Sequence, residues 1–170
     1  MDNIVFYLPY FFAVAALVTL IALSVIDFRT WILPDWLNLT LALLGIFFHI
    51  STDFTLLTPD SMVIGCLAGG GLLWIVRFFG NRHYGQDTLG LGDVKLMAAG
   101  GLWLGGEAII LAMTVGAFAG LLHGIAVALI RAIKTRTRPN LKRLMIPAGP
   151  GFCVGLLVLA IYQYGEYFTK

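Results

Sequence analysis

Charged residues are scarce in this sequence. Only 12% of its 170 residues are Asp, Glu, Lys or Arg, whereas 59% are hydrophobic. This balance excludes an ordinary soluble domain of this size, because such a domain needs more polar side chains on its surface. The composition predicts an all-α, polytopic membrane protein.

Cysteine and histidine are scarce too. Cys66 and Cys153 lie far apart in apolar segments, with no CxxC pair, which excludes a disulfide framework and a structural zinc site. His49, His83 and His123 are scattered across the predicted topology, so a shared metal site is not supported. We expect no metal and no cofactor.

Long runs of apolar residues make up most of the sequence. The first run, 4–26, contains no charged residue and is long enough to cross roughly 30 Å of hydrocarbon as a helix. It is too long for the apolar part of a signal peptide, and Asp2 precedes it where a basic residue would be expected. We expect a single transmembrane domain over residues 1–170, with a turn at Gly105, Gly106 and Glu107. About six transmembrane helices are predicted, at 4–26, 36–50, 61–79, 94–104, 108–130 and 147–165.

The charged residues sort onto two sides of these helices. Short cytoplasmic loops are enriched in Lys and Arg. Ten of the eleven basic residues fall on one side: Arg29, Arg77, Arg82, Lys95, Arg131, Lys134, Arg136, Arg138, Lys142 and Arg143. The other side holds Asp2, Asp53, Asp60, Glu107, Glu166 and Lys170. Both termini are therefore predicted to lie outside the cytoplasm.

The basic stretch from Arg131 to Arg143 also resembles a nucleic-acid-binding segment. Membrane topology and anionic lipids already account for a basic cluster beside a transmembrane helix. We therefore expect membrane lipids as partners of this stretch, and no nucleic acid.

Two aspartates lie at the ends of apolar segments, where a charged side chain is unusual. Asp27 ends the first apolar run as that run reaches the cytoplasmic face, and Asp93 opens the fourth as it leaves the same face. An ionisable group near bilayer depth is costly unless it is paired, hydrated or functional. The matched depth leads to the hypothesis that Asp27 and Asp93 meet as an acid/base pair. The alternative is that each merely caps a helix end.

Paired carboxylates have a specific chemistry. Two carboxylates within a few Å cannot both be ionised cheaply, so they share a proton and hold a base beside an acid. The base can activate water while the acid polarises a peptide carbonyl, which is aspartyl peptide hydrolysis. Paired membrane carboxylates also serve as proton relays, so a small proton-coupled transporter or channel is the alternative function. A structural assembly factor is a third interpretation.

Three ordered motifs resemble those of the prepilin peptidase (type IV leader peptidase) family. In Asp27–Asp35, DFRTWILPD, one aspartate precedes a Pro-Asp pair. Gly90–Lys95, GLGDVK, resembles the GxGD motif with its trailing lysine. Ile146–Pro150, IPAGP, resembles an element before the last helix. The resemblance runs over nearly the whole chain.

This resemblance implies a membrane aspartyl protease with Asp27 and Asp93 as its catalytic pair. The family cleaves the basic leader of type IV prepilin-like precursors at the cytoplasmic face of the membrane, which implies prepilin or pseudopilin substrates and a multi-pass protein of the bacterial inner membrane. The chain looks like the short peptidases of Tad/Flp pilus systems. The N-terminal region of the long, bifunctional members, with its paired CxxC motifs, is absent, so N-methyltransferase activity is not expected.

Five further residues are candidates for substrate binding or loop support. Gly90 and Gly92 allow the backbone of a substrate to approach closely. Asp35 is expected to cap a helix start or to contact the basic leader, and Asp87 to be a solvated loop residue or a leader contact. Lys95 is expected to bind a lipid phosphate or a substrate carbonyl, or to extend to the interface.

Overall fold

Helices account for nearly all of the chain. A computed structural model describes residues 2–135 and 147–169 and confirms the all-α class for them. The helices are α1 (Asp2–Thr30), α2 (Asp35–Ser51), α3 (Pro59–Tyr84), α4 (Leu91–Thr135) and α5 (Gly149–Phe168). Arg136, Arg138, Lys142, Arg143 and Ile146, which the sequence analysis singled out, lie outside the described residues.

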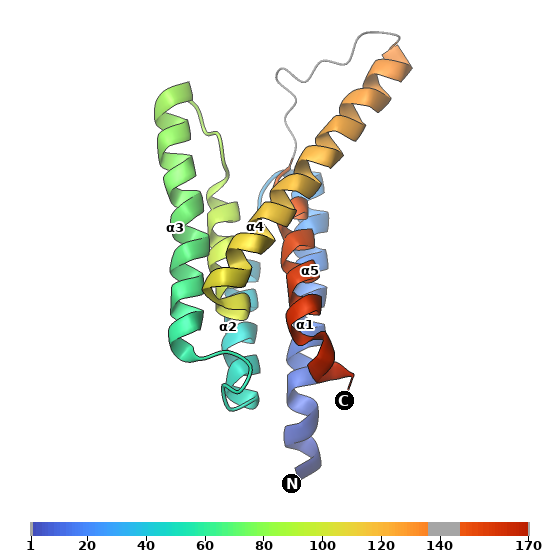
Figure 1. The fold of residues 1–170 in the computed structure, drawn as a ribbon. Helices are drawn as coiled ribbons and strands as arrows, with labels where there is room; N and C mark the ends of the chain where they lie inside the picture. The colour runs from blue at the N-terminus through green and yellow to red at the C-terminus, as the bar shows by residue number, and fades with distance from the viewer. Residues whose placement is uncertain (1, 136–146, 170) are drawn as a thin grey trace.

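Helix α4 is broken near its middle. Gly105 has φ 77° and ψ 179°, a conformation that favours glycine because an L side chain there would be strained. The turn was predicted over Gly105–Glu107, and Gly105 is the residue within α4 whose backbone leaves helical geometry. Figure 1 shows the chain reversing direction within α4. The helix therefore supplies two segments, which lie on either side of Gly105.

The number of membrane crossings is only partly defined by these helices. Helices α1, α3, α4 and α5 are each long and apolar enough to cross a membrane, and the apolar helix α2 is shorter. Both termini lie toward the same end of the bundle (Figure 1). The count of six crossings and the side on which the termini lie remain predictions.

Glycines bring α3 against the first segment of α4. A Cβ atom added to Gly65 would overlap the backbone of Gly101, and one added to Gly101 would overlap the backbone of Gly65. Gly69 meets the Met97 backbone in the same way. Without side chains between them, the two backbones touch, as is common where membrane helices pack through small residues.

Trp103 joins three helices at the end of this segment. Its indole Nε1 donates a hydrogen bond to the Leu41 carbonyl at 2.8 Å, and its ring stacks on Phe48 of α2. Its own carbonyl bonds to His49 Nε2 at 3.2 Å and accepts a hydrogen bond from the hydroxyl of Tyr164 on α5. These bonds fix the last turn before the break at Gly105.

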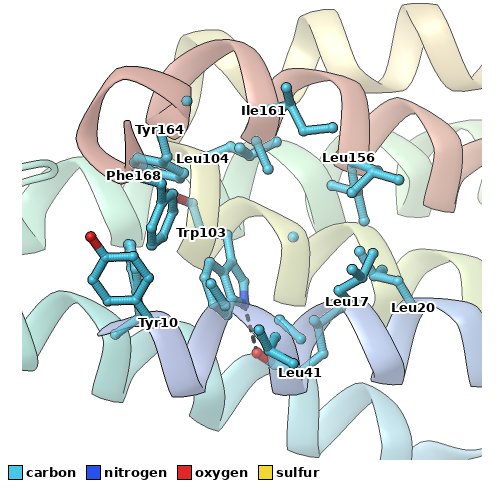
Figure 2. A pocket seen from close by; sticks show the side chains of 18 residues that line it. Tyr10, Leu17, Leu20, Leu41, Trp103, Leu104, Leu156, Ile161, Tyr164 and Phe168 are labelled. Carbon is cyan, nitrogen blue, oxygen red and sulfur yellow. Dashed lines mark hydrogen bonds between the residues drawn. The ribbon is translucent and has the colours of Figure 1, made fainter. Parts of the chain in front are cut away.

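A cavity of about 560 Å³ lies beside Trp103 (Figure 2). Its walls come from α1, α2, α4 and α5 and are almost entirely apolar, with Leu17, Leu20, Leu156 and Ile161 among them. Asp27 and Asp93 are not part of its lining. The cavity is thus separate from the pair of aspartates.

The glycine contact gives a test of the packing. We expect Gly65→Ala to lower the free energy of unfolding by roughly 1–3 kcal/mol, because the added methyl group collides with backbone that has little room to move. Gly71→Ala is the matched control: nothing lies within 4 Å of the added atom, so stability should stay equal or rise slightly. Denaturant unfolding in detergent micelles measures both, and equal stability of the two variants would contradict the close approach.

Candidate active site

Asp27 lies in the last part of α1 with its side chain turned into the protein. It is only 5% exposed, and its Oδ2 accepts a hydrogen bond from the backbone amide of Gly149 at 3.1 Å. Gly149 is the first residue of α5, so the carboxylate faces the positive end of that helix. A Cβ atom on Gly149 would lie 2.7 Å from Oδ2, so this approach requires glycine.

Asp93 lies in the first turn of α4 and is 7% exposed. The backbone amide of Gly90 donates a hydrogen bond to its carboxylate. Asp93 Oδ1 is buried and has no hydrogen-bond partner among the described residues. One oxygen of this carboxylate is therefore held by the glycine loop, and the other is available to a donor.

The structure brings the two aspartates together. Their carboxylates are close enough to interact electrostatically, although 66 residues separate them in sequence. Leu33, in the short connection between α1 and α2, packs against both Gly92 and Gly149. This buried side chain thus ties the segment before Asp93 to the helix start that holds Asp27. The predicted convergence of Asp27 and Asp93 is present in the fold.

A thiol and a hydroxyl lie beside the pair. Cys153 is buried one turn into α5, close enough to interact electrostatically with both Asp27 and Asp93. A side-chain hydrogen bond joins Cys153 to Ser24, which lies one turn before Asp27 on α1. Cys153 therefore covers the pair from the α5 side.

Two contacts join α2 to the start of α4. Lys95 Nζ lies 2.6 Å from Asp35 Oδ2, and these side chains are 41% and 71% exposed. Asn38, one turn further along α2, is buried, and its Nδ2 donates a hydrogen bond to the Gly92 carbonyl at 3.3 Å. Asp35 and Lys95 therefore partner each other at the surface, while Asn38 holds the backbone next to Asp93.

The loop before α4 is fastened to the end of α3. Asp87 Oδ1 accepts hydrogen bonds from Arg77 and from Asn81, each at 2.8 Å, and Arg77 also donates to the Leu89 carbonyl. Asn81 Oδ1 in turn accepts a hydrogen bond from the Thr88 amide at 2.8 Å. Asp87 thus supports the loop that carries Gly90, although its side chain is 76% exposed.

Sequence reasoning missed two residues of this site. Gly149 was recognised only as part of a motif, and its bond to Asp27 depends on how α5 meets α1. Asn38 was not singled out, although it is a polar residue in an apolar helix, which is a weak signal. Among the described residues, no group of three or more His, Cys, Asp or Glu is placed to hold a metal ion.

Comparisons with known proteins give a consistent result. A model of the type IV leader peptidase family matches residues 14–125, a range that includes both aspartates. No solved structure gives a significant match.

Several similar curated proteins carry the name prepilin leader peptidase/N-methyltransferase. The protein from Pectobacterium carotovorum is 40% identical over 60% of this chain and 36% of its own length. The one from Escherichia coli K12 is 33% identical over 81% of this chain and 57% of its own length. The one from Aeromonas hydrophila is 35% identical over 89% of this chain and 48% of its own length. The chain thus spans between about a third and somewhat over half of the length of these relatives.

The contacts of Asp87 with Arg77 and Asn81, which hold the loop before α4, can be tested directly. Replacing Asp87 by Ala removes the acceptor for Arg77 and Asn81, so residues 85–90 should open more often. If the free energy needed to open this loop falls by roughly 1 kcal/mol, an added protease should cleave the loop about fivefold faster. Asp60→Ala, at the other end of α3, is the control and should leave the rate unchanged. An unchanged rate in Asp87→Ala would show that other contacts hold the loop.

Proposed function

Because the chain belongs to the type IV leader peptidase family, we propose that it is a membrane aspartyl endopeptidase with Asp27 and Asp93 as its catalytic pair. One observation carries this proposal. Two carboxylates from different helices are buried together at one end of the bundle, where each is held by the backbone amide of a glycine. Such an arrangement is costly unless the pair is used.

The proposed reaction needs only the two carboxyl groups and water. The pair holds one proton, since two ionised carboxylates at close range repel each other. The ionised group takes a proton from water as the water oxygen bonds to the scissile carbonyl carbon, and the protonated group gives its proton to the carbonyl oxygen. The carbon–nitrogen bond then breaks as the leaving nitrogen takes the proton from the group that activated the water. A hydroxyl of the tetrahedral intermediate gives its proton to the other carboxylate as the new carboxylic acid forms, so the pair again holds one proton.

The substrate enters beside exposed backbone in this proposal. Gly90 is exposed although Asp93 next to it is buried, so an extended peptide can reach the pair along the glycine loop. Gly90 has no side chain to block this approach, whereas the space beside Gly92 is occupied by Leu33. Asp93 Oδ1 has no hydrogen-bond partner among the described residues, so it is the oxygen proposed to bind the attacking water or the substrate.

Type IV prepilin-like precursors are the proposed substrates, which means Tad/Flp pilins or pseudopilins with a basic leader. The relatives are named for prepilin leader peptidase activity, and the apolar helices fit a multi-pass protein of the bacterial inner membrane. Arg29, Arg77 and Lys95 lie at the same end as the pair, which supports cleavage at the cytoplasmic face.

A basic leader would meet acidic groups that already have partners. Asp35 is paired with Lys95, and Asp87 with Arg77. Because all four side chains are at least partly exposed, these pairs are weak enough for a lysine or arginine of the leader to exchange into them. Binding of the leader is thus proposed to proceed by exchange of ion-pair partners.

Cleavage of precursors tests the catalytic pair. We expect a reconstituted mixture with a panel of prepilin precursors, short Flp-type ones included, to yield mature protein that begins at the leader junction. Asp27→Asn and Asp93→Asn should each lower kcat by at least about 100-fold, because an amide neither takes up nor shares the proton. Gel shift and N-terminal sequencing measure the products.

Asp60→Asn serves as the matched control, since this residue lies in the first turn of α3, away from the pair. Its cleavage rate should equal that of the unaltered protein. Full activity in either dyad variant would refute the assignment of the pair. If no precursor is cut and the protein instead moves protons or solutes across proteoliposome membranes, the transporter interpretation holds.

A further inference from the structure

Asn38 forms a side-chain contact with the catalytic loop that the sequence motifs do not include. It lies on α2, is only 3% exposed, and donates a hydrogen bond through Nδ2 to the Gly92 carbonyl at 3.3 Å. Gly92 directly precedes Asp93. The bond therefore acts on the peptide unit that leads into the catalytic residue.

The orientation of the Asn38 amide follows from its partner. A backbone carbonyl only accepts hydrogen bonds, so the amide nitrogen must face Gly92. The amide oxygen then points elsewhere, and it is buried without a donor among the described residues. Asp93 Oδ1 is also buried without a donor among the described residues. Two buried acceptors without donors thus flank the backbone at the start of α4.

Stability alone does not explain an asparagine at this position. A buried acceptor that lacks a partner costs roughly 1–3 kcal/mol, whereas one hydrogen bond contributes about 1 kcal/mol net. Leu37 and Leu41 on the same helix are buried and apolar, so a leucine at position 38 is compatible with this part of α2. Leucine also has the higher helix propensity. The hydrogen bond from the Asn38 amide to the Gly92 carbonyl is therefore the feature that an asparagine provides at this position.

We propose that Asn38 is a positioning residue for the reaction: by holding the Gly92 carbonyl, it sets the position of Asp93 relative to Asp27. This inference rests on the proposed peptidase function. Displacement of a reacting group by about 1 Å can lower a rate about 100-fold. The other nearby tie between α2 and α4, Asp35 with Lys95, is exposed and holds the helix start less firmly. Asn38 supplies a buried tie at the start of α4, next to Asp93.

Two substitutions separate positioning from folding. Asn38→Leu keeps the branching and number of heavy atoms but removes the donor, so kcat should fall at least about tenfold. KM should stay within about twofold of the unaltered value, because the leader-binding groups are untouched, and the melting temperature in detergent should be equal or higher. Thr40→Val is the control, because the Thr40 hydroxyl bonds only within its own helix, to the Trp36 carbonyl at 2.8 Å.

Asn38→Asp adds a second readout. An ionised carboxylate cannot donate to the Gly92 carbonyl, whereas a protonated one can. The ratio of its kcat to that of the unaltered protein should therefore rise as the pH falls, while the ratio for Asn38→Leu stays constant.

The outcomes separate this inference from the proposed function. Full kcat in Asn38→Leu, a loss of kcat that merely follows a lower melting temperature, or failure of both variants to accumulate in the membrane would overturn the positioning role. None of these outcomes affects the catalytic pair. Failure of the unaltered protein to cut any precursor would instead overturn the proposed function.

Discussion

Two carboxylates held away from water are the constraint on which this structure depends. The free energy cost of burying Asp27 and Asp93 is reduced, but not cancelled, by fixed backbone donors, from Gly149 at the start of α5 and from Gly90 before α4. Both donors require glycine, because a Cβ atom on either residue would press on the carboxylate it serves. The fold brings one helix end and two helix starts to a single place so that these bonds can form.

The surrounding contacts are graded from the interior to the surface. Leu33 fills the space between Gly92 and Gly149, and Asn38 holds the Gly92 carbonyl from the side. Further out, exposed ion pairs fasten the same helix start and the loop before it. The buried contacts fix distances, whereas the exposed ones can exchange partners without disturbing the pair.

Much of this arrangement could be predicted from the sequence, because charge in an apolar chain is conspicuous. The uncharged run before Asp27, the glycines before Asp93 and the distribution of basic residues were enough to predict helices, the pairing and its end of the bundle. Asn38 could not be found in this way, since a neutral amide costs less in an apolar helix than a charge does. The Asp35–Lys95 pair was missed because its members lie 60 residues apart and no periodicity connects them.

The break at Gly105 also has a consequence for how each part of α4 is held. The segment of α4 before Gly105 is too short to be held in a bilayer as an independent span, and it carries Asp93 and Lys95 at its start. The longer apolar segment after Gly105 reverses direction and runs at an angle past α5 (Figure 1). The residues after Gly105 therefore supply the part of α4 that is long and apolar enough to cross a membrane, and the segment that carries Asp93 depends on the neighbouring helices for its place.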